Sequence, residues 1–146
     1  LHSPQARCNP SMIDPRCQFW CPPHACQTNH TPVAHISRYA HTKVGDEDDL
    51  LRAVSIGPVA VAIDASQPDF MSYTGGVYSN AACMSDKAGL DHAVLAVGWG
   101  SSAAGVPYWI VKNSWGTTWG MDGYFHLQRN ASNMCGIATD ASMPLV

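Results

Sequence analysis

Short runs of apolar, β-branched residues recur through the second half of the chain and predict a sheet. Glycine-rich turns separate these runs, as is typical of strands joined by irregular loops. The expected strands cover residues 59–63, 93–97, 108–111 and 124–128. Because several strands with irregular turns favour an antiparallel sheet or barrel, we predict a mainly β fold of the α+β class.

One stretch before the first strand has a helical pattern instead. Asp46 is a candidate N-cap, and the acidic residues after it suit the positive end of a helix. The apolar positions that share one face are Leu50, Leu51 and Val54. Gly57-Pro58 ends the pattern, so we predict one short helix near residues 46–55. We interpret the acidic run as a helix start rather than a metal site.

The beginning of the chain shows no sustained period and is rich in Cys, Pro and His, which predicts loops held by cross-links. We therefore divide the chain into a cross-linked segment, residues 1–35, and a folded domain, residues 36–146. The segment holds four of the six cysteines: Cys8, Cys17, Cys21 and Cys26. They can pair among themselves in three ways, and the sequence does not choose between these. A zinc site that adds His24 to this cluster is the weaker alternative, since the spacing lacks two Cys-x2-Cys pairs.

The composition excludes several classes of protein. Charged residues make up 13% of the 146 residues, and the formal net charge is −3. An average soluble domain is about 25% charged, and disordered, coiled-coil or nucleic-acid-binding chains need more charge than this one has. No run of about 20 apolar residues is present to span a membrane. We expect no nucleic-acid partner and no membrane span, and the low charge favours a surface that packs against a protein partner or another copy.

The six cysteines and two glycosylation sequons favour an oxidising compartment. The sequons are Asn29-His30-Thr31 and Asn130-Ala131-Ser132, so N-glycans are expected at Asn29 and Asn130. The predicted location is extracellular, secreted or lysosomal. Leu1 is not an initiator methionine and no signal-peptide pattern follows it, so we expect a processed or trimmed product.

Two local patterns carry the candidate chemistry. Residues 90–100 place His92 at the start of an expected strand, and residues 108–124 contain the run Asn113-Ser114-Trp115-Gly116. An asparagine can accept the ring N–H of a histidine and so fix its tautomer and direction. His92 and Asn113 are therefore a candidate base and orienting group, with Trp115 covering their hydrogen bond from water. A histidine that enters a strand is also commonly structural, and this alternative stays open.

These two patterns resemble the C-terminal half of papain-like cysteine peptidases, nearest the cathepsin L branch. Residues 57–65 resemble the stretch leading into that half, and the resemblance covers about residues 34–146. It implies a right-hand domain built around an antiparallel β-barrel. It also implies that His92 is the catalytic histidine, Asn113 its orienting asparagine and Trp115 the shielding indole.

The resemblance implies further roles by position. Cys83 and Cys135 match the disulfide of this domain in the family. Ala93 and Asp140 match residues of the S2 substrate pocket, where a buried Asp140 would favour a basic side chain. An exposed acidic residue near the end of the chain is the open alternative for Asp140. No cofactor and no metal ion is expected.

The nucleophile of the family is missing from the sequence. Neither the Cys-Gly-Ser-Cys-Trp motif nor the oxyanion-hole Gln that precedes it occurs in the 146 residues. The thiolate is the nucleophile in this chemistry, so His92 alone cannot begin acyl transfer. This predicts a truncated homologue that lacks the catalytic cysteine and acts as a non-catalytic extracellular binding or structural, assembly-forming glycoprotein. Its partner, or a second copy of itself, would meet the face that the family buries against its left-hand domain.

An active enzyme is the alternative function. In that case the chain is one part of a two-chain papain-like cysteine endopeptidase and supplies His92 and Asn113, while another chain supplies the nucleophile. If instead these residues persist for packing, Trp115 belongs to the core. Trp115→Ala would then destabilise the domain by roughly 3–5 kcal/mol.

Overall fold

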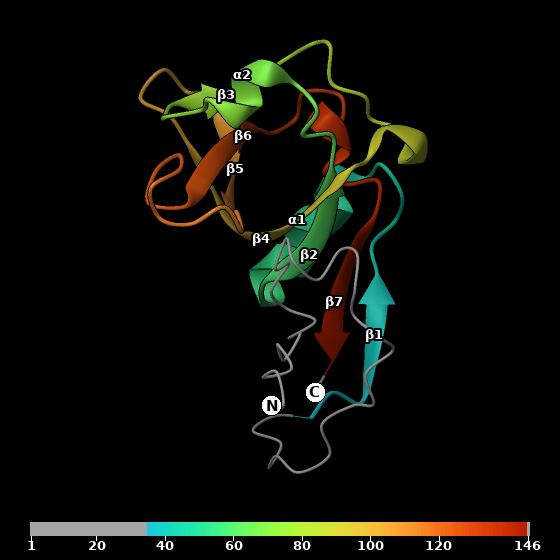
Figure 1. The fold of residues 1–146 in the computed structure, drawn as a ribbon. Helices are drawn as coiled ribbons and strands as arrows, with labels where there is room; N and C mark the ends of the chain where they lie inside the picture. Colours follow the sequence, from blue (N-terminus) through green and yellow to red (C-terminus); the bar gives the residue numbers. More distant parts are fainter. Residues whose placement is uncertain (1–34, 146) are drawn as a thin grey trace, which may run out of the picture. The chain divides into compact units, whose positions relative to one another are not determined.

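The computed structural model describes residues 35–145, whose strands form one sheet in the order β1-β7-β2-β4-β5-β6-β3 (Figure 1). The strands are β1 (Arg38–His41), β2 (Val59–Ile63), β3 (Val77–Tyr78), β4 (His92–Ser101), β5 (Pro107–Lys112), β6 (Tyr124–Gln128) and β7 (Ala141–Leu145). The α-helices are α1 (Glu47–Ile56) and α2 (Pro68–Met71), and the 3₁₀ turns are η2 (Lys87–Gly89) and η3 (Met134–Gly136).

The structure confirms the mainly β class. The strands expected at residues 59–63 and 124–128 coincide with β2 and β6, and the other two expected strands lie within the longer β4 and β5. The sheet is strongly curved in Figure 1, yet within residues 35–145 its end strands β1 and β3 do not pair with each other. It is therefore an open sheet rather than a closed barrel. All its pairings are antiparallel except that of β3 with β6.

The sequence pattern did not predict β1, β3 or β7, and β1 and β7 gain their regularity from pairing with each other. β7 contains Pro144, and proline is disfavoured inside strands because it cannot donate to the ladder. Its partner β1 pairs with it antiparallel, with Tyr39 opposite Pro144. Pro144 is exposed, while Met143 beside it is buried and packs into the core. The boundary expected between residues 35 and 36 stays a prediction, since residues 1–34 lie outside the described part.

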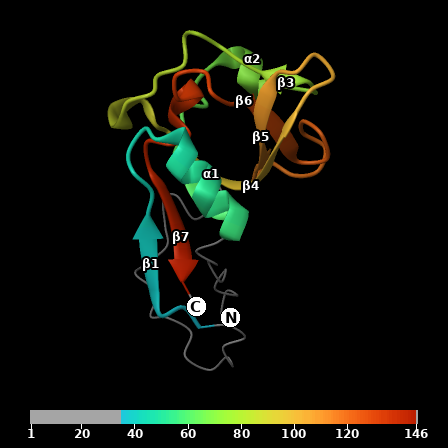
Figure 2. The ribbon, with the colours of Figure 1, turned by 180° about the vertical axis from the view of Figure 1, so that it is seen from behind.

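Helix α1 confirms the helix expected near residues 46–55. The side chain of Asp46 accepts a hydrogen bond from the Asp49 N–H at 2.9 Å, which makes it the N-cap. The helix buries Leu50, Ala53 and Val54, and it packs against β2 and β4 (Figure 2). Within residues 35–145, no helix combines the length and the apolar character that crossing a bilayer requires.

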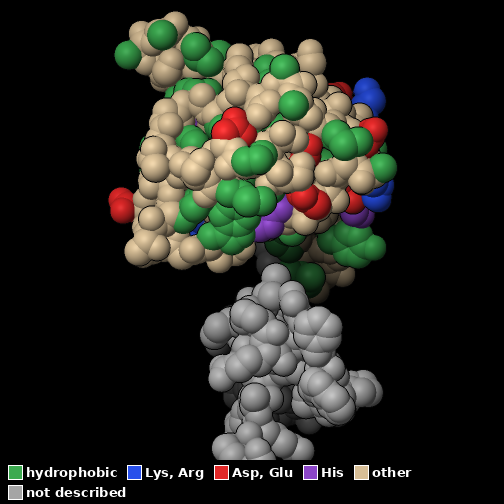
Figure 3. Space-filling model, turned by 45° about the horizontal axis from the view of Figure 1, so that its top comes forward, with side chains coloured by type: hydrophobic (Ala, Val, Ile, Leu, Met, Phe, Trp, Pro, Cys, Tyr) green, Lys and Arg blue, Asp and Glu red, His purple; other side chains and the backbone are tan. Residues whose placement is uncertain are grey.

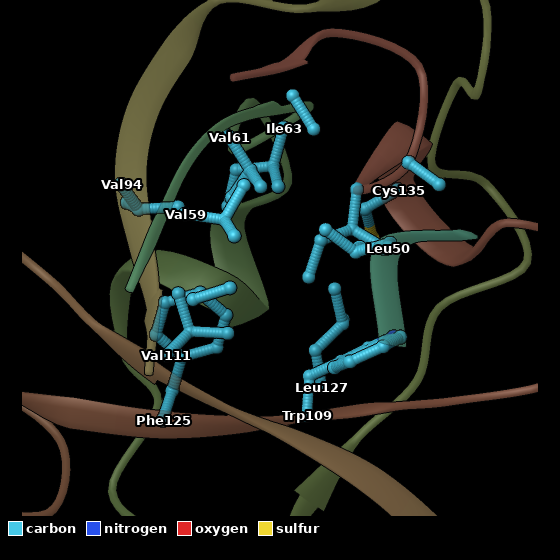
Figure 4. Close-up of a cluster of buried hydrophobic side chains, with 14 of the residues drawn as sticks. Leu50, Val59, Val61, Ile63, Val94, Trp109, Val111, Phe125, Leu127 and Cys135 are labelled. Carbon is cyan, nitrogen blue, oxygen red and sulfur yellow. The ribbon is translucent and has the colours of Figure 1, made fainter. Parts of the chain in front are cut away.

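The main core lies between the inner faces of the strands and helix α1 (Figure 4). Alternate residues of β2 point inward, as the period of two along a strand requires. Their side chains meet residues of β4, β5, β6 and α1, and the labelled members of this group are Leu50, Val59, Val61, Ile63, Val94, Trp109, Val111, Phe125, Leu127 and Cys135. Phe70 of α2 begins an aromatic extension of this core, in contact with Phe125 at a ring-centroid distance of 4.9 Å.

Trp109→Ala should lower the free energy of unfolding by about 3–5 kcal/mol, as deletions of fully buried aromatic side chains do. Trp109 has no exposed surface, and its Nε1–H donates to Oε2 of Glu47 at 3.0 Å, so the change leaves both a cavity and an oxygen that has lost a donor. Urea unfolding of the full chain measures the loss.

The matched control is Trp99→Ala, because Trp99 of β4 is 42% exposed. Its loss should stay below about 1 kcal/mol. Equal losses for the two variants would show that Trp109 does not anchor the core.

Candidate functional site

The sheet brings His92 and Asn113 together at the junction of two neighbouring strands. His92 is the first residue of β4, and Asn113 directly follows β5. Since β4 and β5 run antiparallel, the start of the first lies beside the end of the second. The His92 Nε2 lies 2.8 Å from Oδ1 of Asn113, with His92 half-buried and Asn113 buried. Both backbones are fixed by pairings within the sheet or close to it, so the contact is held rigidly.

The hydrogen bonds of Asn113 determine the tautomer of His92. Oδ1 of Asn113 also accepts the Ser114 N–H at 2.8 Å, which identifies this atom as the amide oxygen. An amide oxygen cannot donate, so Nε2 of His92 must carry the proton of the bond. In the neutral ring Nδ1 then keeps its lone pair and can accept a proton. The arrangement is that of an oriented general base.

Trp115 lies over the imidazole of His92. The two ring centroids are 4.9 Å apart and their planes are tilted by 31°. The Trp115 ring packs against Phe70 and Trp119, with ring-centroid distances of 5.6 and 5.0 Å. The aromatic cluster therefore holds one side of the Trp115 ring. Within the described residues Trp115 is nevertheless 39% exposed. The expectation of a core tryptophan is therefore wrong, and Trp115→Ala should cost less than the roughly 3–5 kcal/mol of a buried aromatic deletion.

Two carboxylates that the sequence analysis overlooked lie near the start of β4, and the first of them, Asp91, holds that start in place. The Asp91 N–H donates to the Ile63 carbonyl at 3.1 Å, and Oδ1 of Asp91 accepts the Ala65 N–H at 2.8 Å. These two hydrogen bonds join Asp91, the residue before His92, to the end of β2. An acidic residue directly before the candidate base was the signal in the sequence.

The second carboxylate is Asp64, which is 1% exposed. Its Oδ1 accepts from the N–H and the hydroxyl of Ser66, at 2.9 and 2.6 Å, and its Oδ2 accepts the Met84 N–H at 2.7 Å. Burial alone would raise the pKa of Asp64, but the hydrogen bonds from Ser66 and Met84 outweigh it, and the pKa lies below its ordinary value. Asp64 is thus a buried carboxylate that stays charged.

A disulfide between Cys83 and Cys135 lies beside Asp64. It joins positions 52 residues apart, and the Asp64 N–H donates to the Cys135 carbonyl at 2.9 Å. This is the pairing that the family resemblance implies. The other expected cysteines, Cys8, Cys17, Cys21 and Cys26, and the sequon at Asn29 lie outside the described residues.

Ala93 and Asp140 come close together, on either side of Ala62. Ala62 is the register partner of Ala93, and its N–H donates to the Asp140 carbonyl at 3.0 Å. The Asp140 side chain is 39% exposed, and its Oδ2 lies 3.1 Å from Nζ of Lys87. If Asp140 lined the S2 pocket as expected, its carboxylate would be buried. In the described domain this carboxylate is partly exposed and forms an ion pair with Lys87. Their role in a substrate pocket stays a prediction.

A shallow hollow of about 250 Å³ adjoins Asn113, and its walls include Ala93, Lys112 and Ser114. Asn130 follows β6 and is exposed. Residues 35–145 contain no group of three His, Cys, Asp or Glu side chains placed to hold a metal ion.

The chain is similar to known proteins over most of its length. Residues 12–145 match the family described as papain family cysteine protease. This match begins inside the segment 1–35, further toward the N-terminus than residue 34, where the resemblance noted in the sequence starts.

Two relatives are much longer than the region that this chain matches. Cysteine proteinase 3 of Dictyostelium discoideum is 53% identical over 113 residues, which cover 77% of this chain and 33% of the relative. The cathepsin L-like peptidase of Aedes aegypti is 53% identical over 123 residues, covering 83% of this chain and 36% of the relative. The chain thus spans about a third of the length of these relatives.

Solved structures share the fold. The bromelain protease from Ananas comosus, in complex with the E64 inhibitor, has a TM-score of 0.76 and 40% identity, covering 84% of this chain and 57% of the other. The digestive procathepsin L2 proteinase from the larval midgut of Tenebrio molitor has a TM-score of 0.72 and 51% identity, covering 78% of this chain and 35% of the other. These likenesses confirm the mainly β, papain-like fold that the sequence resemblance implies, whereas the described sheet is open and does not close into the implied barrel.

Asp64→Asn should lower the free energy of unfolding at pH 7 by about 1–3 kcal/mol, because the amide cannot accept all three hydrogen bonds. The folded-state pKa lies below the ordinary value, so the stabilisation is fully present above about pH 4 and is lost as the pH falls through the folded-state pKa. Urea unfolding at pH 7, 5 and 3 would show a constant gap between wild type and variant that closes only at the lowest pH.

Asp122→Asn is the control, since Asp122 is exposed and asparagine tolerates its left-handed backbone at φ 54°. Its effect should stay within about 0.5 kcal/mol. A gap for Asp64→Asn that widens toward pH 3 would contradict the charged state of Asp64.

Proposed function

Since the chain belongs to the papain family of cysteine proteases, we propose that residues 35–145 supply the imidazole half of a cysteine peptidase site. His92 is the base and Asn113 orients it. The observation that carries the proposal is the 2.8 Å contact between Nε2 of His92 and Oδ1 of Asn113, which leaves Nδ1 free to take a proton. This orientation is the one that a general base requires.

The chemistry follows from the free Nδ1. A thiol placed beside it transfers its proton to Nδ1, and the resulting thiolate attacks the carbonyl carbon of a peptide. The imidazolium returns the proton to the leaving amine, which breaks the peptide bond and leaves an acyl-enzyme. His92 then takes a proton from the water that hydrolyses this thioester. Throughout, Asn113 holds the Nε2–H, so only Nδ1 exchanges protons.

The thiol comes from outside this sequence under the proposal. The 146 residues contain no Cys-Gly-Ser-Cys-Trp run, and the relatives are about three times as long as the part that matches. A segment or chain that carries the motif would complete the cleft beside His92. Trp115, partly exposed here, would then shield the His92–Asn113 hydrogen bond from water.

The substrate is a peptide under the same proposal. Ala93 and Asp140 form part of the S2 pocket, and Asp140 attracts a basic side chain in competition with Lys87. The Cys83–Cys135 disulfide supports maturation in an oxidising compartment, in agreement with a secreted or lysosomal location.

A non-catalytic binding or assembly role is the second candidate, and surface chemistry favours it. Hydrophobic side chains cover more of the face in Figure 3 than charged ones do. Large hydrophobic residues exposed in the described domain are Ile36, Tyr39, Val44, Ile56, Met71, Met84, Trp99 and Trp115. Where exposed apolar side chains of this kind gather into one patch, they commonly bind other proteins. A partner or second copy that covers them without supplying a thiol would give a protein with no peptidase activity.

Co-expression with a complementing segment separates the two candidates. The full chain is co-expressed with the part of the Aedes aegypti peptidase that precedes the matched region, and the pair is purified together. The peptidase proposal predicts hydrolysis of a fluorogenic peptide with a basic residue and labelling by an E64-based probe. His92→Ala should then lower kcat/KM by roughly 10²–10⁴.

His126→Gln is the matched control, because His126 of β6 stacks on Tyr108 at a ring-centroid distance of 3.9 Å, away from Asn113. It should leave kcat/KM unchanged. A pair that stays together during purification yet neither cleaves the peptide nor binds the probe would reject the peptidase proposal and favour the non-catalytic one.

A further inference from the structure

We propose that Asn130 carries an N-linked glycan, which lies at the end of the sheet opposite His92. Asn130-Ala131-Ser132 has the sequence that the transfer of such glycans requires. The catalytic proposal does not use this segment, and the glycan does not depend on peptidase activity.

Both side chains that the modification needs are accessible. Asn130 and Ser132 are exposed in the structure. Among the described residues, Oδ1 of Asn130 has only a long contact of 3.5 Å with an Arg129 nitrogen. Within residues 35–145 its Nδ2 donates no hydrogen bond, so attaching a sugar there breaks none.

The loop is held by its backbone and not by these side chains. The carboxylate of Glu47 accepts the N–H groups of Asn130 and Asn133 at 2.9 and 3.0 Å. Asn130 and Ser132 adopt left-handed conformations, with φ of 57° and 56°. Glu47 therefore fixes the backbone on its inner side, and a modified Asn130 can be accommodated without rearranging the loop.

Space for a carbohydrate adjoins the site. An open hollow of about 470 Å³ lies between Asn130 and residues 43–48 at the start of α1. Its walls include Lys43, Asp46 and Asp48, whose polar groups suit the hydroxyl groups of a sugar. The first sugar residues have room to lie along this surface.

The strand register places Asn130 far from the candidate base. Tyr124 is opposite Lys112, directly before Asn113, whereas Gln128 is opposite Tyr108 at the other end of β5. Asn130 follows Gln128 by two residues. At about 3.3 Å per residue, the two ends of this ribbon are roughly 15–20 Å apart. A glycan on Asn130 therefore leaves His92 uncovered, and whatever completes the cleft approaches from the other end.

The covalent step needs a polyprenyl-diphosphate-linked oligosaccharide as donor. Nδ2 of Asn130 forms a bond to C1 of the first N-acetylglucosamine and loses one proton. The bond from C1 to the diphosphate oxygen breaks, and the polyprenyl diphosphate leaves. No oxidation or reduction occurs. The Cys83–Cys135 disulfide is consistent with passage through the secretory compartment, where such donors are found.

The test is mass spectrometry of the full chain secreted from a eukaryotic cell. Asn29→Gln removes the other sequon, so a remaining glycan belongs to Asn130. We expect the peptide that contains Asn130 to carry a glycan, and peptide N-glycosidase F to release it. Asn130→Asp and Ser132→Asn should each abolish it, and both replacements tolerate the left-handed backbone. Ala131→Ser preserves the sequon and should retain the glycan.

Peptide mapping of the wild-type chain decides the question if any variant fails to be secreted. Recovery of the Asn130 peptide entirely without sugar from secreted protein would overturn the proposal, as would a glycan that persists in Asn29→Gln, Asn130→Asp protein. For the placement, diethyl pyrocarbonate should modify His92 equally fast before and after enzymatic removal of the glycan. Slower modification of the glycosylated chain would overturn the placement without bearing on the peptidase proposal.

Discussion

The buried carboxylate of Asp64 is the constraint on which the site depends. Its three hydrogen bonds join the chain directly after β2 to the segment around Met84. The neighbouring disulfide adds Cys135 to this cluster, and Asp91 ties the start of β4 to the same end of β2. Each donor would be costly to leave without an acceptor in the interior. His92 thus begins its strand from a point that four separate segments of the chain hold in place.

The candidate site is complete on one side only. Within the described residues, the base has its orienting amide, a fixed tautomer and a partly exposed indole over its ring. Asn113 lines a shallow hollow, and Trp115 is partly exposed. Both candidate functions propose that further protein packs on this side of the domain.

Much of this arrangement was predictable from the sequence, and the exceptions share a cause. The apolar runs predicted the exact bounds of β2 and β6, and the N-cap with the apolar face predicted α1. Local periodicity along the sequence carries that information. The residue types suggested the pairing of His92 with Asn113, and the family resemblance supported it, since neither residue alone distinguishes a base from a structural histidine. Strand β7, with Pro144, and the ligands of Asp64 were missed because only contacts between distant segments create them. Trp115 was misjudged for the same reason, as apolar character does not reveal which side of a ring faces outward.

The carboxylate of Glu47 has a consequence for how the domain forms during synthesis. It belongs to the first turn of α1, yet its donors are Trp109, Asn130 and Asn133, which lie 62, 83 and 86 residues further along the chain. Strand β1 can form its pairing only later still, because its partner β7 ends at Leu145. On a ribosome, which adds residues from the N-terminus, helix α1 and β1 emerge long before the groups that complete them. The domain is therefore expected to acquire its native structure only once the chain as far as Leu145 has emerged.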